Sequence, residues 1–171
     1  KVPRDHGVDT VGAVKLMHEC NSVFISMGGN FLSAMSDTKI TANALRKCNL
    51  TVQISTKINR SHLVTGNKAL ILPCLGRTEI DQTSNGTQFV TVENSMGIVH
   101  SSQGNSKPVS DNLKSEVAIV TGIALALEEK LSRKNINWRN LSNNYDKIRD
   151  LISSCIDGFG DYNTLVRKKG G

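Results

Sequence analysis

The sequence predicts an α/β fold, a Rossmann-like parallel sheet with helices on both faces that together form a three-layer sandwich. Three short apolar runs, at residues 23–27, 50–54 and 69–72, have the length and composition of strands, and the first, which ends at glycines, is typical of a buried parallel strand. Helical patterns alternate with these runs, and such alternation is typical of a parallel sheet covered by helices. The 171 residues suffice for one hydrophobic core. We therefore expect residues 1–171 to form a single α/β domain, as a fragment of a larger multidomain subunit.

The first half of the chain is expected to run helix, strand, helix, strand, short helix, strand. Asp9 or Thr10 can cap the first helix, because both side chains accept hydrogen bonds from exposed backbone N–H groups. The run 23–27 follows and ends at two glycines, which mark the end of a strand. Ser36 or Asp37 can cap the next helix, whose apolar and small positions include Ile40, Ala44, Leu45 and Cys48.

The second half begins with loops and ends with helices. Residues 55–63 are expected to form a loop that leads into a short helical segment. Residues 75–112 are rich in Gly, Ser, Thr and Asn around one clear extended run, 88–92, and a loop-rich segment of this length is more often functional than idle. Residues 116–131 are helical and apolar nearly all round, which predicts a buried helix. Residues 145–156 have the pattern of a further amphipathic helix.

Charge and cysteine content narrow the classes of function. The net charge of +6 suits nucleic acid, an anionic cofactor, or a basic face against another domain. Nucleic-acid binding is disfavoured, because the aromatic residues, only 4% of the chain, are not interleaved with Lys and Arg. No C-x-x-C and no histidine at ligand spacing accompany the cysteines, so we expect no metal site, in a reduced, cytoplasmic protein with structural thiols. No apolar run approaches the length of a membrane span, so we expect none. The cysteines are Cys20, Cys48, Cys74 and Cys155.

The strongest local signal is Gly28-Gly29-Asn30, directly after the first predicted strand. Ligands bind above the carboxyl ends of parallel strands. Two glycines let the backbone approach a ligand closely, and Asn30 can both donate and accept hydrogen bonds. An ordinary turn between a strand and a helix is the alternative. The pattern is not G-x-G-x-x-G, so it does not predict a classical dinucleotide fingerprint.

Ser55-Thr56-Lys57 gives a second signal, because it follows the second predicted strand directly. Hydroxyl groups and a cation at the carboxyl end of a strand suit a phosphorylated ligand, and further polar residues follow nearby. A solvated polar loop is the alternative. Two polar strand ends on one sheet edge favour a shared site more than either motif does separately. The further polar residues are Asn59, Arg60 and His62.

A third signal, Gly76-Arg77-Thr78-Glu79, follows the third predicted strand. Arg77 could pair with a phosphate group. Glu79 could accept a hydrogen bond from a guanine edge or from Arg77 itself. A structural ion pair between Arg77 and Glu79 is an equally good interpretation.

Several blocks of the chain together resemble the formate-dehydrogenase-like molybdopterin oxidoreductase alpha subunits of the dimethyl sulfoxide reductase superfamily. The likeness covers nearly the whole chain, and some of the blocks are long. It departs at Asn94, where the family often has Asp. The blocks are residues 27–31, 55–63, 71–79, 89–93, 95–96, 99–100, 114–120, 158–159 and 161–163.

The resemblance implies a Rossmann-like central domain that holds one dinucleotide by its pyrophosphate and guanosine. In that superfamily two pterin guanine dinucleotides hold a molybdenum, and many members carry an iron–sulfur cluster near the amino terminus. This chain has neither a cluster motif nor an identifiable metal ligand, so the fragment is expected to be metal-free and inactive without the remaining domains of its parent chain. Carried over by motif, the cofactor-binding residues are Gly28, Gly29, Asn30, Ser55, Thr56, Lys57, Arg77 and Glu79.

Two other functions stay open at this point. A stand-alone nucleotide- or phosphate-binding module could use the same strand ends. A nucleic-acid-binding domain is motivated only by the basic charge balance, and it ranks last.

Overall fold

The computed structural model describes residues 7–19, 21–131 and 136–168. They form two compact units, which we treat separately: an N-terminal unit within residues 2–74 and a C-terminal unit within residues 75–171. The single domain expected over residues 1–171 stays a prediction. Cys20 lies outside the described residues.

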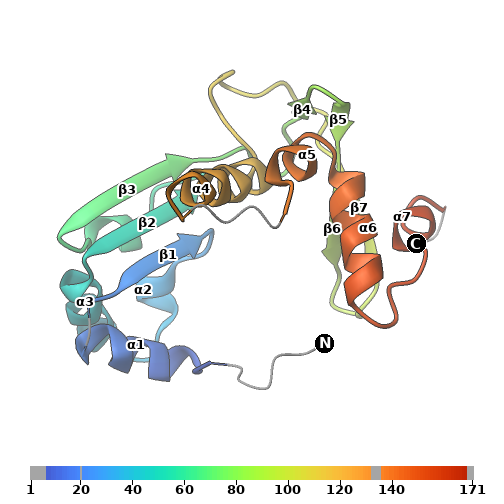
Figure 1. The fold of residues 1–171 in the computed structure, drawn as a ribbon. Coiled ribbons are helices and arrows are strands. Elements are labelled where there is room, and N and C mark those ends of the chain that lie inside the picture. The colour runs from blue at the N-terminus through green and yellow to red at the C-terminus, as the bar shows by residue number, and fades with distance from the viewer. Residues whose placement is uncertain (1–6, 20, 132–135, 169–171) are drawn as a thin grey trace. The chain divides into compact units, whose positions relative to one another are not determined.

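The N-terminal unit is built on a parallel sheet of three strands in the order β1-β2-β3. Ile25 of the first strand lies opposite Val52, and Val52 lies opposite Leu70 of the third. The predicted class, α/β with a Rossmann-like parallel sheet flanked by helices, is confirmed (Figure 1). The strands are β1 (Val23–Met27), β2 (Leu50–Ser55) and β3 (Lys68–Pro73).

Helices α1, α2 and α3 lie on one face of this sheet (Figure 1). As expected, Asp9 accepts a hydrogen bond from the first turn of α1, and Asp37 caps α3 by accepting from the Ile40 N–H. The four-residue helix α2 was not expected from the sequence. A short 3₁₀ helix, η1, follows β2 where a helical segment was expected. The bounds are α1 (Thr10–Glu19), α2 (Phe31–Ala34), α3 (Thr38–Lys47) and η1 (Arg60–Leu63).

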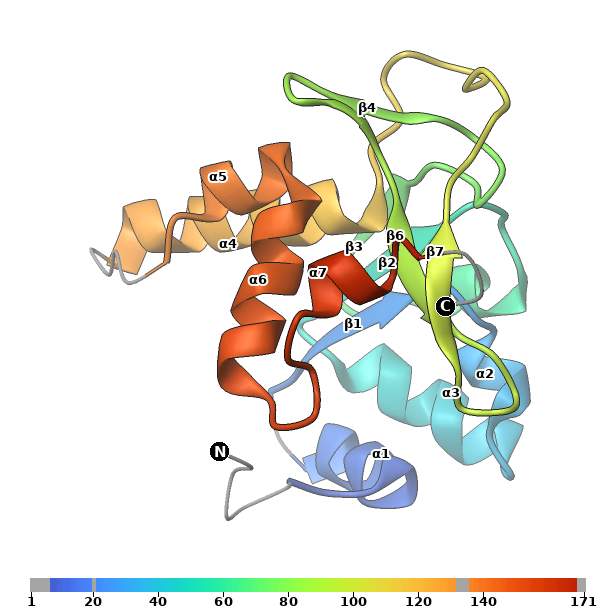
Figure 2. The ribbon, with the colours of Figure 1, turned by 90° about the vertical axis from the view of Figure 1, so that its right-hand side faces the viewer.

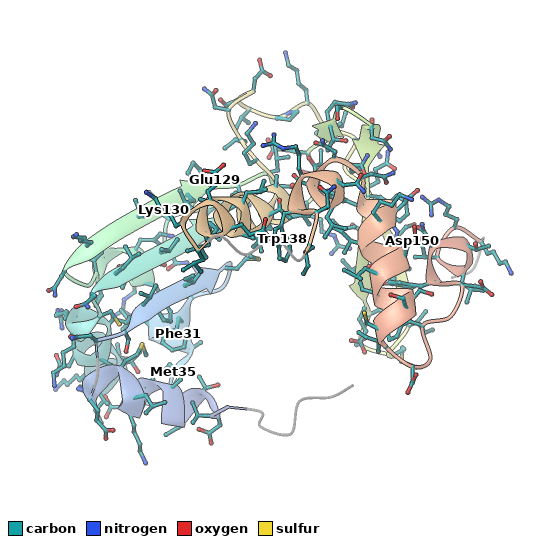
Figure 3. All side chains as sticks on the ribbon, viewed as in Figure 1. Phe31, Met35, Glu129, Lys130, Trp138 and Asp150 are labelled. Carbon is teal, nitrogen blue, oxygen red and sulfur yellow. The ribbon has the colours of Figure 1, made fainter. Side chains whose placement is uncertain are left out.

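The core of the N-terminal unit lies between these helices and the sheet. Ala44 and Leu45 of α3 are fully buried there, and Phe31 and Met35 pack against the cluster from the segment after β1 (Figure 3). The other buried members come from α1, α2 and α3 and from the residues directly after α3 and η1. They are Val14, Met17, Leu32, Ala42, Cys48 and Val64.

The prediction that β1 is a buried strand is wrong, because three of its five residues are exposed and the other two are only half-buried. Among the described strands, β1 lies at one edge of its sheet. Successive side chains of a strand point to opposite faces. Phe24 packs against the core, whereas its neighbours Val23 and Ile25 are 61% and 53% exposed. An apolar run therefore identified the strand but not its position in the sheet.

The C-terminal unit contains two antiparallel strand pairs. β4 pairs with β5 in a tight hairpin that the sequence did not suggest, and β6 pairs with β7. The expected extended run at 88–92 is divided between β5 and β6. The bounds are β4 (Asp81–Thr83), β5 (Gly86–Gln88), β6 (Val90–Glu93) and β7 (Val99–Ser102).

Helix α4 has the expected bounds, but the prediction that it is buried is wrong. Thr121 is its only buried residue, and Leu127 and Leu131 are more than half exposed. Within its own unit α4 packs mainly against α5, and Trp138 of α5 lines a hollow with Leu125 of α4 (Figure 3). The apolar pattern of α4 shows which of its side chains could be buried. Their burial also needs neighbouring elements that cover them. The two helices are α4 (Glu116–Leu131) and α5 (Trp138–Asn143).

Helices α6 and α7 lie side by side next to the β6–β7 pair (Figure 2). The predicted helix at 145–156 is confirmed as α6, although its buried residues are Tyr145 and Arg149 and not its aliphatic ones. Within residues 7–19, 21–131 and 136–168, no helix is long and apolar enough to cross a membrane. The bounds are α6 (Tyr145–Cys155) and α7 (Tyr162–Leu165).

Candidate functional site

Two glycines shape the turn at the carboxyl end of β1. Gly28 and Gly29 have φ angles of +64° and +68°, in the left-handed region that costs other residues roughly 1–2 kcal/mol. A Cβ at either position would meet no atom within 4 Å. Backbone conformation, and not crowding, therefore favours glycine here, and the space beside the turn is open. The Gly28 N–H donates to the Ile54 carbonyl at 2.8 Å, which ties the turn to the end of β2.

The loop after β2 is held by a capping box at the start of η1. Asn59 is the N-cap, and its Oδ1 accepts a hydrogen bond from the Ser61 N–H at 2.9 Å. In return, Nδ1 of His62 accepts from the Asn59 N–H at 3.1 Å. This reciprocal pair satisfies two backbone donors that the start of a helix otherwise leaves open.

Hydrogen bonds join this loop to the glycine turn. Asn59 Nδ2 donates to the Gly29 carbonyl at 2.8 Å, and Ser61 Oγ donates to Asn30 Oδ1 at 3.0 Å. Ser61 Oγ also accepts from the Leu32 N–H at 2.9 Å. The structure thus brings the first two predicted motifs to one sheet edge, as expected. We call Asn59, Ser61 and His62 the loop clamp.

Ser55, Thr56 and Lys57 follow β2 directly and differ in how they are engaged. Ser55 Oγ donates to the Lys57 carbonyl at 2.7 Å, so its hydroxyl shapes the turn. The side chains of Thr56 and Lys57 are exposed. Among the described residues, no carboxylate forms an ion pair with Lys57. Lys57 is therefore the residue of this motif that is best placed to bind an anion.

Arg77 and Glu79 lie in the C-terminal unit, and each is engaged within that unit. Arg77 Nε donates to Ser102 Oγ at 3.2 Å. The carboxylate of Glu79 accepts from two backbone N–H groups, those of Gly76 at 2.6 Å and Val109 at 2.9 Å. These two hydrogen bonds lower the pKa of Glu79. The ion pair between Arg77 and Glu79 does not occur among the described residues, and their contact with a cofactor stays a prediction.

The structural role of the loop clamp is not evident from the sequence. Asn59 and His62 stand out only as polar residues near the second motif, and Ser61 does not stand out at all. The spacing Asn-x-x-His resembles the S/T-x-x-E/Q pattern of a capping box and could have revealed the 3₁₀ helix. Nothing in the sequence places Ser61 beside Asn30, which is 31 residues away.

In the part of the chain that the structure describes, no three or more His, Cys, Asp or Glu side chains lie together in a way that could hold a metal ion. His6 lies outside the described residues.

The chain is similar in sequence to segments of longer known proteins. No model of a protein family matches it. It is 50% identical over 166 residues, 96% of its length, to Uncharacterized oxidoreductase Rv2900c of Mycobacterium tuberculosis and to Uncharacterized oxidoreductase Mb2924c of Mycobacterium bovis. It is 47% identical over 147 residues, 86% of its length, to Protein YdeP of Escherichia coli. The chain spans about a fifth of the length of these relatives, 21% for the mycobacterial proteins and 19% for YdeP.

Proposed function

We propose that this chain is a cofactor-binding domain of a molybdopterin-dependent oxidoreductase, and that the joined carboxyl ends of β1 and β2 hold the phosphate-bearing part of a guanine dinucleotide. The observation that carries the proposal is the pair of loops joined by Asn59 and Ser61 beside the open turn at Gly28 and Gly29. The names of the mycobacterial relatives support the proposal that the parent protein is an oxidoreductase. The molybdopterin part rests on the family resemblance.

The chemistry of this edge fits a phosphate group. The backbone N–H groups of Gly29 and Asn30 have no acceptor among the described residues. A phosphate oxygen could accept from both, because the glycines leave room for close approach. The Lys57 ammonium group adds a positive charge on the neighbouring strand end. Gly28, Gly29, Asn30, Thr56 and Lys57 would thus hold the phosphates, with Ser55 shaping the turn.

The redox chemistry belongs, on this proposal, to the rest of the parent protein. When bound, the molybdenum centre would carry the electron transfer, while this chain binds and orients the nucleotide end of the cofactor. The described residues include no cluster fit to ligate the metal. The partners of the domain are the remaining domains of its own parent chain, and the coverage of about a fifth of each relative favours this over a stand-alone module.

Titration of the full-length protein with guanosine diphosphate tests the proposal. The protein is purified in its cofactor-free form from cells that cannot make the molybdenum cofactor, and binding is measured by calorimetry. Replacing Lys57 by Met removes one charge-assisted hydrogen bond, so we expect the Kd to rise about tenfold or more. Lys39→Met, an exposed lysine on α3, is the matched control and should leave the Kd unchanged.

Two results would contradict the site assignment. One is an absence of guanosine diphosphate binding in the wild-type protein. The other is an equal Kd for wild type, Lys57→Met and Asn30→Ala. A structure of the complex with the diphosphate far from Asn30 and Thr56 would also remove the site from this edge.

A further inference from the structure

The turn at Gly28 and Gly29 needs an external restraint to keep one shape. Glycine loses more conformational freedom on folding than any other residue, and two in succession make a turn that is flexible by itself. We propose that the loop clamp, Asn59, Ser61 and His62, consists of positioning residues that hold this turn ready for a phosphate group. The inference rests on the function proposed above, and it gives these three residues a positioning role that neither the sequence motifs nor the comparisons assign.

Asn59 uses both ends of its amide. Oδ1 accepts from the Ser61 N–H at 2.9 Å and so starts η1, while Nδ2 donates to the Gly29 carbonyl at 2.8 Å. The same side chain therefore fixes the start of one loop and the second glycine of the other. A turn held in its bound shape before the ligand arrives loses less entropy on binding, and its affinity is correspondingly higher.

Ser61 anchors the turn to the sheet. Its hydroxyl donates to Asn30 Oδ1 at 3.0 Å and accepts from the Leu32 N–H at 2.9 Å, and the side chain is only 3% exposed. Its carbonyl accepts from Nε2 of Gln53 at 2.7 Å, and Gln53 lies on β2. Ser61 thus links the segment after β1 to a strand in the middle of the sheet.

His62 completes the clamp through Nδ1, which lies 3.1 Å from the Asn59 nitrogen, 3.3 Å from its carbonyl oxygen and 3.2 Å from its Oδ1. All three atoms belong to Asn59, so the ring is tied to the N-cap residue whichever ring nitrogen carries the proton. Nε2 is buried and has no hydrogen-bond partner among the described residues, so within these residues Nδ1 makes the hydrogen bonds of the ring. A glutamine at the same position of a capping box makes the equivalent bond.

The test separates positioning from direct contact in the full-length, cofactor-free protein. Asn59→Ser keeps an N-cap acceptor but loses the donor to Gly29, because serine is an equally good N-cap with a shorter side chain. We expect about a fivefold rise in the Kd for guanosine diphosphate, the effect of one neutral hydrogen bond. Amide hydrogen exchange in the peptide that spans residues 27–35 should become faster by a similar factor. Asn43→Ser, on the exposed side of α3, is the matched control.

A conservative rescue and a contact variant complete the design. His62→Gln should retain both the affinity and the slow exchange, whereas His62→Leu should lose both. Lys57→Met should weaken binding without changing the exchange of residues 27–35, since it removes a ligand contact and not a clamp bond.

The outcomes distinguish this inference from the proposed function. If Lys57→Met weakens binding while Asn59→Ser and His62→Leu change neither the Kd nor the exchange, the clamp has no positioning role and the proposed function stands. If His62→Gln behaves like His62→Leu, the capping-box role of His62 is wrong. If the wild-type protein binds no guanosine diphosphate, the proposed function fails, and a positioning role at its site fails with it.

Discussion

The loop clamp of the N-terminal unit and helix α6 of the C-terminal unit both depend on buried polar side chains. They differ in whether every polar atom of these side chains has a hydrogen-bond partner. The two buried residues of α6 are Tyr145 and Arg149. The Tyr145 hydroxyl donates a hydrogen bond to Asp81 Oδ2 at 2.5 Å, and a second hydrogen bond of 2.6 Å joins it to Ser115 Oγ. In the clamp, by contrast, Nε2 of His62 has no partner among the described residues.

Arg149 shows how fully the α6 anchor is satisfied. Its Nε donates to Asn163 Oδ1 at 2.7 Å, its Nη1 donates to the Phe89 carbonyl at 3.1 Å, and its Nη2 pairs with Asp146. Its guanidinium lies 3.9 Å from the centre of the Phe89 ring, a cation–π contact. Because Arg149 is only 3% exposed, this anchor is closed to a ligand. The glycine turn beside the clamp keeps two backbone N–H groups that have no acceptor among the described residues, which is what a binding edge requires.

The largest expected effect comes from Arg149→Ala. The substitution removes three hydrogen bonds and the cation–π contact of a side chain that is almost fully buried, so the free energy of unfolding should fall by about 3 kcal/mol. Urea denaturation followed by circular dichroism measures this change. Lys147→Ala removes an exposed ion pair of the same helix, in which Lys147 Nζ lies 3.8 Å from Asp150 Oδ2, and should cost less than about 0.5 kcal/mol. Equal losses for the two variants would show that Arg149 is not an anchor.

Tyr145→Phe should have the next largest effect, a loss of about 1.5 kcal/mol at neutral pH, because it removes the hydroxyl that joins Asp81 and Ser115. Burial, and then the hydrogen bond to Asp81, raises the pKa of Tyr145 above its ordinary value of 10.0. The neutral form is therefore favoured by folding. Its stabilisation is complete below pH 10 and is lost as the pH rises toward the folded-state pKa. Unfolding midpoints measured from pH 9 to pH 11 should fall more steeply in the wild type than in Tyr145→Phe.

Gly29→Ala should reduce stability by about 1 kcal/mol, because alanine is strained at a φ of +68°. The affinity for guanosine diphosphate should fall as well, since the turn would relax. Gly122 in α4 is the matched control, because a Cβ there also meets nothing within 4 Å but the backbone is helical. Gly122→Ala should stabilise the protein by about 0.5–1 kcal/mol. A gain in stability from Gly29→Ala would remove the backbone argument for this glycine.

The smallest expected effect is the acid response of Glu79. Hydrogen bonds from the N–H groups of Gly76 and Val109 lower its pKa below the ordinary value of 4.5. Its contribution to stability is thus present above pH 4.5 and is lost as the pH falls through the lowered value. Glu79→Gln should flatten the loss of stability between pH 5 and pH 3 in thermal unfolding. An unchanged acid slope would mean that these two hydrogen bonds do not hold the ionised carboxylate.

The sequence predicted elements well where one local pattern dominates. The apolar run of β2, the long apolar segment of α4 and the amphipathic pattern of α6 correspond to elements at nearly the expected bounds. The four-residue helices α2 and α7 and the β4–β5 hairpin are too short for a periodic signal, and they form because surrounding contacts favour them.

The candidate site was predictable in part for the same reason. Strand ends in a parallel sheet share an edge, so the meeting of the Gly28 and Ser55 motifs follows from topology alone. The hydrogen bond between Ser61 and Asn30 joins residues 31 positions apart, and no local pattern encodes it. Arg77 and Glu79 looked like a third part of the same site, whereas the structure shows only their engagement within the C-terminal unit.

The hydrogen bonds between the two loops also make them a transferable module for protein engineering. The donors and acceptors that join them all lie within residues 28–32 and 53–62. Grafted together onto two adjacent strands of another parallel sheet, the segments would carry their own restraints. Residues 28–32 grafted alone would leave the Gly29 carbonyl and the Leu32 N–H without their partners, and residues 53–62 grafted alone would leave Asn59 Nδ2 without its acceptor. Such a pair has to be exchanged or redesigned as one unit.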